Sequence, residues 1–184
     1  MPQITPTSLP DVVEITPERF SDERGFFSEV YNEAALKQAG IDCEFVQDNH
    51  SFSASNRVLR GLHFQSPPFA QAKLVRVTRG SVMDVAVDIR PRSPTFRQWA
   101  RVEVSAKKWN QVYIPAGFAH GFVTLEPDTE VLYKVSAAYS VKHEHAIRYD
   151  DLALGIDWGV DLSKVILSDR DREAPLFSEI ESGF

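Results

Sequence analysis

Two histidine-bearing stretches of this chain carry residue types that can move protons. The first is the run LRGLHFQ, in which Arg60 and His63 lie within four residues on a mostly apolar segment. An imidazole titrates near neutral pH, so His63 is a candidate general base, a candidate ligand, or a hydrogen-bonded core residue. Strict strand alternation places Arg60 and His63 on opposite faces. If both serve one site, we expect a β-bulge or a strand end at Gly61.

The second stretch is YIPAGFAHGF, residues 113–122. Its proline and glycine predict a turn, after which Phe118, His120 and Phe122 share one face of a strand. An aromatic wall with one imidazole suits an organic ligand better than a purely structural core.

A lysine also falls on an apolar strand face, since Lys73 alternates with Val75 and Val77. A lysine in that setting needs an anion or a carboxylate partner. Asp84 on the following strand is one candidate partner, so a plain structural ion pair and a role at a site both remain open.

Further proton carriers are spread along the second half of the chain. Tyr133 and Tyr139 share a strand face if the strand is unbroken, and a tyrosine can deliver a proton, stack on a base or simply pack. Ser168 and Asp171 have the spacing of a helix capping box. The alternative for Asp171 is a carboxylate that orients a histidine.

The five histidines raise the question of a metal, and they are His50, His63, His120, His143 and His145. The segment His143-Glu144-His145 has ligand-like spacing, but its charge-rich surroundings are typical of a loop. Position 65, which would complete a His-x-His pair with His63, is Gln65. We therefore expect no metal site.

The elements that carry these residues are mostly strands. Residues 83–89 alternate between apolar and acidic or small side chains, and residues 97–104 alternate similarly, which is the period of a strand. Other runs bounded by turn residues predict strands near 44–52, 58–65, 72–79, 111–114, 117–124 and 130–138. Many short strands at this spacing predict an all-β antiparallel sandwich or barrel.

Only short helices are expected beside these strands. Asn32 is a candidate N-cap for residues 33–39, with Gly40 just past the end, and a second helix is expected to start at Ser168. No glycine-rich phosphate loop joins a strand to a helix, which argues against a Rossmann or P-loop enzyme.

Composition fits one globular domain spanning residues 1–184, with 43% apolar and 25% charged residues. The net charge of −6 argues against a nucleic-acid surface, although local cations can still bind a small anion. No apolar run is long enough for a membrane span, and the start of the chain lacks the features of a signal peptide. Cys43 is the only cysteine, so we expect a cytoplasmic protein without an internal disulfide.

Taken together and in order, these segments resemble the dTDP-4-dehydrorhamnose 3,5-epimerase family, which has the cupin (jelly-roll) fold. The resemblance covers nearly the whole chain and is specific because the pieces occur jointly. They are DERGFF at 22–27, QDNHS at 47–51, RGLHFQ at 60–65, KLVRV at 73–77, DVAVDIR at 84–90, SPTF at 93–96, PAGFAHGF at 115–122, YK at 133–134 and LSDRD at 167–171.

The resemblance implies roles for particular residues. His63 matches the general base, Asp171 the carboxylate that orients it, and Tyr133 the general acid, while Lys73 matches the cation that steadies an enolate. Tyr139 matches a residue that stacks on thymine. The other matches to substrate-binding positions are Arg24, Glu29, Gln47, Asp48, Asn49, Arg60, His120, Glu144 and Arg170. The resemblance also implies a homodimer, in which the segment carrying Arg24 serves the partner's site.

The implied reaction inverts C3 and C5 of dTDP-4-dehydro-6-deoxy-D-glucose, giving dTDP-4-dehydro-L-rhamnose for dTDP-L-rhamnose biosynthesis. The 4-keto group acidifies the C–H bonds at both carbons, so a base on one face and an acid on the other suffice. Neither a cofactor nor a metal is needed.

Several positions depart from the family pattern, notably Ala72 where the family often has Gly, Arg170 where it often has Lys, and the segment 138–158. These departures leave open an enzyme that epimerises one centre or isomerises the ketosugar. A non-catalytic sugar-binding cupin and a metal-dependent cupin oxygenase are the alternatives from other classes.

Overall fold

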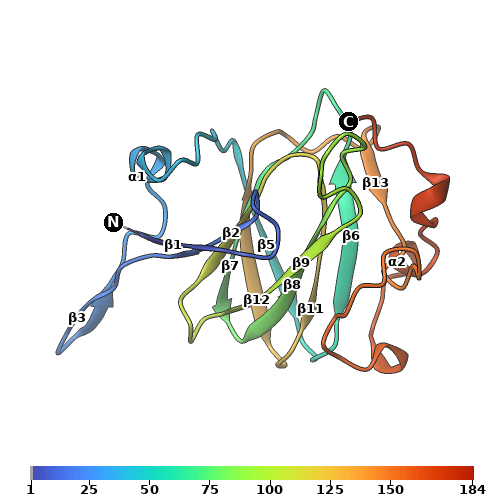
Figure 1. Ribbon diagram of the computed structural model, residues 1–184. Coiled ribbons are helices and arrows are strands. Elements are labelled where there is room, and N and C mark those ends of the chain that lie inside the picture. The colour runs from blue at the N-terminus through green and yellow to red at the C-terminus, as the bar shows by residue number, and fades with distance from the viewer. Residues whose placement is uncertain (1) are drawn as a thin grey trace.

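Two antiparallel sheets pack face to face in the computed structural model, which describes residues 2–184 (Figure 1). The six-stranded sheet has the order β1 (Gln3–Pro6), β2 (Val13–Thr16), β10 (Gln111–Ile114), β7 (Lys73–Arg79), β12 (Thr129–Val135) and β5 (Gln47–Ser53). The five-stranded sheet has the order β13 (Glu144–Ala146), β6 (Leu59–Gln65), β11 (Phe118–Thr124), β8 (Ser81–Asp88) and β9 (Trp99–Ser105). The all-β jelly-roll class predicted from the sequence is confirmed.

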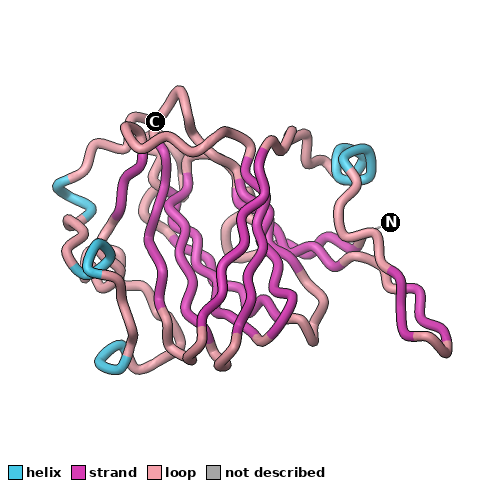
Figure 2. The backbone as a smooth tube through the Cα atoms, turned by 180° about the vertical axis from the view of Figure 1, so that it is seen from behind, coloured by secondary structure: helices cyan, strands magenta, loops and turns pink. Residues whose placement is uncertain are grey.

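A small hairpin of β3 (Phe20–Asp22) and β4 (Gly25–Phe27) projects from the body, at the lower left of Figure 1. The helices are short and lie at the edges of the sheets (Figure 2). They are α1 (Glu33–Gln38), α2 (Asp169–Arg172) and the 3₁₀ turns η1 (Leu162–Lys164) and η2 (Phe177–Glu179). None of the helices within residues 2–184 has the length and apolar character that a membrane crossing requires.

Both predicted helix starts are confirmed by their capping bonds. The Asn32 side chain accepts from the backbone N–H of Ala35 at 3.1 Å, and Gly40 follows with a φ of +89°. Ser168 Oγ accepts from the N–H of Asp171 at 3.1 Å, which starts α2. The second cap places Asp171 at a fixed point on a single helical turn.

The β8 strand is buried on both faces. Its Val82 and Ala86 belong to the core between the sheets, whereas Val85 and Val87 pack beneath the C-terminal segment with Trp158. The sequence pattern predicted that one face packs and that the face with the acidic side chains meets polar groups. The acidic face does meet polar groups, because its carboxylates bond partners inside the protein.

One of those acidic side chains, Asp88, anchors the loop after β8. Its carboxylate is fully buried and accepts hydrogen bonds from Arg90 Nη2 at 2.6 Å, Ser93 Oγ at 2.5 Å and Thr95 Oγ1 at 2.7 Å. Burial alone raises the pKa of Asp88, but these hydrogen bonds outweigh burial and bring it to about 2. The carboxylate is therefore ionised at neutral pH and ties the loop to the sheet.

The loop prediction for residues 143–145 is wrong. Glu144 pairs with Gln65, and His145 with Phe64, so the segment adds β13 to the edge of the five-stranded sheet. Its polar residues hide the strand in the sequence, because Glu144 bonds Tyr139 and Arg170 while the ring of His145 stacks on Phe64. The four N-terminal strands were likewise not predicted.

Candidate active site

His63 and Asp171 form a hydrogen-bonded pair between β6 and α2. His63 Nε2 lies 2.6 Å from Asp171 Oδ1, and the second carboxylate oxygen accepts from Ser168 Oγ at 2.9 Å. Burial raises the pKa of Asp171, but the bonds from His63 and Ser168 lower it more, so the group stays below its usual range. An ionised carboxylate favours the tautomer with the proton on Nε2, which leaves Nδ1 of His63 as the basic nitrogen.

The C-terminal segment brings Asp171 to this position by pairing with the start of β6. The backbone N–H of Leu59 donates to Ile166 O at 3.0 Å, and the N–H of Ile166 donates to Arg57 O at 2.8 Å. α2 follows directly and contacts β6. The Ser-x-x-Asp motif thus caps the helix and also positions the carboxylate.

A β-bulge at Gly61 turns Arg60 and His63 to the same side, as the sequence predicted. His63 pairs with His120 and Arg60 pairs with Phe122, so β6 holds one residue more than β11 over this interval. Gly61 has a φ of +116°, and a Cβ there would lie 2.5 Å from the Cα of Gly121. Only glycine fits this position.

The two sheets enclose a cleft of about 430 Å³ at this point. A smaller pocket of about 140 Å³ shares three of its lining residues and extends it toward β5 and β13. Together they gather most of the residues singled out in the sequence, namely His63, Asp171, Tyr133, Lys73, Arg60, His120, Arg170, Gln47, Asn49, Tyr139 and Glu144.

Lys73 is a buried cation inside this cleft. Its side chain is only 8% exposed, and Nζ donates to the backbone oxygen of His63 at 3.4 Å. Burial lowers the pKa of Lys73 to about 8, against the attraction of Asp84 and Glu144. An ammonium with so few protein partners is available to a negative charge that develops on a bound ligand.

Asp84 pairs with His120 rather than with Lys73, which corrects the partner expected from the strand pattern. The distance from Asp84 Oδ2 to His120 Nε2 is 2.8 Å, and both side chains are buried. Burial lowers the pKa of His120 despite the nearby carboxylate. A neutral imidazole hydrogen-bonded to a carboxylate keeps one fixed orientation toward the cleft.

Tyr133 reaches the cleft from the six-stranded sheet, whereas His63 comes from the five-stranded sheet. A proton donor and a proton acceptor therefore face the same space from different walls. Burial raises the pKa of the Tyr133 phenol, so it holds its proton at neutral pH. The strand ends at Val135, so Tyr139 lies in the following loop rather than on the face of Tyr133.

Charged and polar groups meet at the mouth of the smaller pocket. Glu144 Oε2 accepts from the Tyr139 hydroxyl at 2.5 Å and from Arg170 Nη1 at 2.7 Å. Burial raises the pKa of Glu144, but the bonds from Arg170 and Tyr139 lower it by more, so the pKa lies below its usual value. This carboxylate joins the loop after β12 to α2.

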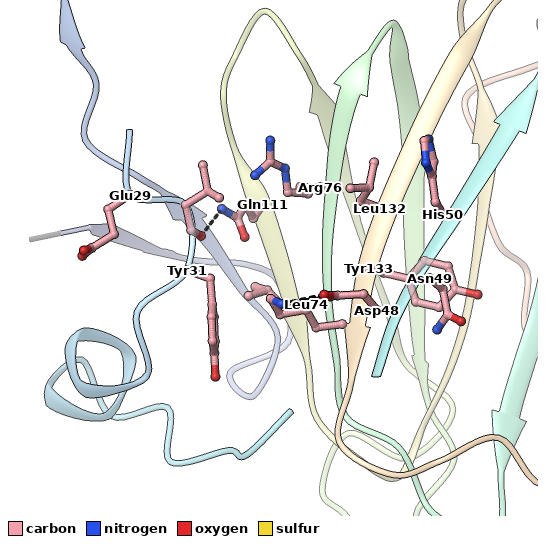
Figure 3. Close-up of a pocket in the computed structure, with 12 residues that line it drawn as sticks. Glu29, Tyr31, Asp48, Asn49, His50, Leu74, Arg76, Gln111, Leu132 and Tyr133 are labelled. Carbon is pink, nitrogen blue, oxygen red and sulfur yellow. Dashed lines mark hydrogen bonds and ion pairs between the residues drawn. The ribbon is translucent and has the colours of Figure 1, made fainter. Parts of the chain in front are cut away.

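Three of the predicted substrate-binding residues lie away from the cleft. Arg24 is exposed in the β3–β4 turn and pairs with Asp22 at 2.5 Å. Glu29 and Asp48 line another pocket of about 360 Å³ on the outer face of the six-stranded sheet, where Asp48 pairs with Lys134 at 2.9 Å (Figure 3). This pocket shares Asn49 and Tyr133 with the smaller pocket of the cleft. Strand alternation explains Asp48, because its neighbours on β5 are the residues that face inward.

Some residues at the site carry roles that the sequence did not reveal. Ser168 was identified only as a cap, yet it also donates to Asp171. His143 and His145 lie beside Ser140 and Ser66 at hydrogen-bond distance.

Across residues 2–184, no three His, Cys, Asp or Glu side chains converge as a metal-ligand set.

Comparison with known proteins identifies sugar-nucleotide epimerases, among them a 3'-monoepimerase from Streptomyces bikiniensis with a TM-score of 0.86 and 36% identity, over 94% of this chain and 87% of that one. The family model described as dTDP-4-dehydrorhamnose 3,5-epimerase matches residues 6–179. The enzyme of that name from Salmonella typhimurium is 51% identical over 174 residues, covering 94% of each chain. The Bacillus anthracis enzyme, crystallised with TDP and PPi, is similar with a TM-score of 0.92 and 45% identity, over 96% of this chain and 99% of that one. A Legionella pneumophila epimerase in complex with dTDP-4-keto-L-rhamnose has a TM-score of 0.93 and 43% identity, over 98% and 95%.

Proposed function

The chain belongs to the dTDP-4-dehydrorhamnose 3,5-epimerase family, and is thus an isomerase of nucleotide sugars, and we propose that it inverts C3 and C5 of dTDP-4-dehydro-6-deoxy-D-glucose. The product is dTDP-4-dehydro-L-rhamnose, an intermediate of dTDP-L-rhamnose biosynthesis. The observation that carries this proposal is the His63–Asp171 pair facing Tyr133 across a cleft that holds a buried lysine.

His63 is the general base of the proposed reaction. Its Nδ1 removes the proton from C3 or C5, each made acidic by the 4-keto group, and the imidazolium that forms is stabilised by the ionised Asp171. The 2.6 Å hydrogen bond keeps the ring in one orientation, so the same nitrogen serves both carbons.

Lys73 and Tyr133 complete the proposed proton transfer. Removal of the proton leaves negative charge on the oxygen at C4, and the buried ammonium of Lys73 stabilises that enolate without solvent reorganisation. The Tyr133 phenol then returns a proton to the opposite face of the same carbon, which inverts it. The phenol keeps its proton until that step because burial raises its pKa.

The remaining cleft residues are proposed to bind the substrate. Arg60 and Arg170 line the cleft beside His63 and suit the diphosphate, since a guanidinium makes paired hydrogen bonds to phosphate oxygens. Tyr139 is proposed to stack on thymine. The sugar hydroxyls are assigned to Gln47, Asn49, His120 and Glu144.

We assign the three residues outside the cleft to a homodimer. Phe20, Phe26 and Phe27 on the β3–β4 hairpin are all exposed, in the segment that leads to the pocket lined by Glu29 and Asp48. In this proposal the hairpin of one subunit reaches the partner, and Arg24 serves the partner's site. The single cupin domain over 1–184 and the cytoplasmic location stay predictions.

The decisive experiment is turnover of the dTDP-4-keto sugar in D₂O, followed by NMR. We expect deuterium at both C3 and C5, with both centres inverted. Deuterium at one carbon alone supports the mono-epimerase alternative, and no exchange at either carbon contradicts an epimerase. A His63→Asn variant is expected to exchange at neither carbon while still binding dTDP, which separates loss of the base from loss of the site.

A further inference from the structure

We propose that three glutamines, Gln47, Gln65 and Gln71, form a clamp that fixes the loop after β12 and so positions Tyr139 for recognition of the nucleotide base. Gln65 and Gln71 are then positioning residues that act on the nucleotide through Tyr139. This inference rests on the proposed function, which assigns base stacking to Tyr139.

The clamp holds four consecutive residues of the loop by their backbone. Gln71 Nε2 donates to Ala137 O at 2.8 Å, and Gln65 Nε2 donates to Ala138 O at 3.2 Å. The N–H of Tyr139 donates to Gln47 Oε1 at 3.3 Å, and the N–H of Ser140 donates to Gln65 Oε1 at 2.7 Å. Three side chains from different parts of the chain thus replace the strand pairing that ends at Val135.

Glutamine is the residue type that this arrangement requires. One side-chain amide carries both a donor and an acceptor, so Gln65 bonds a carbonyl and an N–H of the same loop at once. The donor of Gln65 also bonds Phe69 O at 2.7 Å, and the side chain is only 3% exposed. A carboxylate lacks the donor, and an apolar side chain leaves the loop carbonyls without partners.

Tyr139 depends on this support because its ring has little packing of its own. The side chain is 53% exposed, and its hydroxyl donates to Glu144. A loosely held aromatic ring loses conformational freedom when a ligand binds, which weakens binding. Fixing the backbone on either side of the ring removes part of that cost before the nucleotide arrives.

The clamp also links the base-recognition loop to the proton-transfer residues. Gln65 and His63 are two positions apart on β6 and line the same small pocket as Gln47, Gln71 and Tyr139. One strand therefore holds both the general base and the main anchor of the loop.

The test measures dTDP affinity by calorimetry, together with kcat and KM for the sugar nucleotide, in the uncharged variants Gln65→Met and Gln71→Leu. We expect the dTDP Kd and the KM to rise about five- to tenfold, with kcat within about twofold, as loss of one or two neutral hydrogen bonds implies. Gln71 is less buried than Gln65 and makes a single loop contact, so its variant remains informative if Gln65→Met folds poorly.

Thr129→Val is the matched control. Thr129 is also fully buried, and its Oγ1 donates to a backbone oxygen, that of Glu126, at 2.8 Å at the opposite end of β12 from the clamp. This variant should lower the melting temperature as a clamp variant does, yet leave the dTDP Kd unchanged.

A double-mutant cycle with Tyr139→Ala decides whether the clamp acts through that ring. We expect Gln65→Met to have little further effect on the dTDP Kd once Tyr139 is removed. Additive effects, or an unchanged Kd in both glutamine variants, overturn the clamp. Clamp-dependent dTDP binding without any deuterium exchange in the wild type overturns the epimerase proposal alone.

Discussion

At the scale of single residues, the hydrogen bonds around Asp171 decide which nitrogen of His63 is basic. One carboxylate oxygen binds Nε2 and the other is held by Ser168, so the carboxylate has no freedom to turn away. Helix capping and the proposed proton transfer therefore both involve Asp171.

Asp171→Asn should lower kcat by roughly 10²- to 10⁴-fold, because the amide stabilises neither the required tautomer nor the imidazolium. Deuterium exchange rates measure the loss, and the dTDP Kd should stay within about twofold of the wild type. Asp169→Asn, on the exposed side of the same short helix, is the control and should keep near-normal kcat. Equal activity in both variants would rule out a His63–Asp171 unit.

Lys73→Met should abolish measurable turnover and at the same time stabilise the fold. The buried ammonium costs free energy that an apolar side chain of similar length does not, so unfolding in urea should require about 1–3 kcal/mol more. A variant that loses activity and stability together would show that Lys73 is chiefly a structural ion.

The pH dependence of kcat follows from the same lysine. Its pKa of about 8 means that the ammonium is charged below that pH and neutral above it. Since the enolate needs the charged form, kcat should fall as pH rises through about 8. A profile that stays flat to about pH 10, where an ordinary lysine begins to titrate, would contradict this assignment.

At the scale of elements, the bulge in β6 determines which of its side chains line the cleft. Without the extra residue at Gly61, Arg60 would face the other side of the sheet and the cleft would lose one of its cations. The backbone of β11 passes so close that no side chain fits between the strands.

Gly61→Ala should therefore destabilise the protein by about 2–4 kcal/mol, through a steric clash added to an unfavourable φ. Gly40→Ala is a matched control, since Gly40 also has a positive φ but no atom within 4 Å of the point where a Cβ would lie. Its expected cost is about 1 kcal/mol. Chemical denaturation compares the two, and similar losses would mean that the close approach to β11 is readily relieved.

Strand alternation and turn residues predicted most of the central strands to within a few residues. Alternation identifies strands with one face more buried than the other, such as β5, whereas β11 is buried along its whole length and is delimited by the turn residues around it. They failed for β13, where Glu144 lines the smaller pocket, and for β1, β3 and β4, whose side chains are largely exposed. The bulge at Gly61 was predicted only as a condition for Arg60 and His63 to share a site.

The site itself was predictable only through resemblance. Nothing in local spacing joins His63 to Asp171, since pairing of β6 with the C-terminal segment is a long-range event. The expected Lys73–Asp84 pair failed because His120, on the neighbouring strand, competes for the same carboxylate.

At the scale of the whole molecule, the buried Asp88 should govern part of the acid stability. Its pKa is lowered from 3.8 to about 2, so the folded state favours the ionised form and that stabilisation is fully present above about pH 4. It is lost as the pH falls from about 4 to about 2. Asp88→Asn should cost about 2 kcal/mol at about pH 7 and flatten this part of the stability curve.

Urea unfolding at about pH 7 and about pH 3 measures both effects, with the exposed Asp42→Asn as control. If Asp88→Asn keeps the full pH dependence of the wild type, other carboxylates control the acid transition.

The C-terminal segment that covers the five-stranded sheet also carries Asp171, 108 residues after His63. A ribosome therefore releases the β6 strand long before it synthesises the carboxylate that bonds the imidazole of the proposed base. A nascent chain that lacks this segment also lacks Trp158 and Phe177, which cover the apolar outer face of the five-stranded sheet. The proposed activity therefore requires translation of this segment, so measured activity indicates that the chain extends past it.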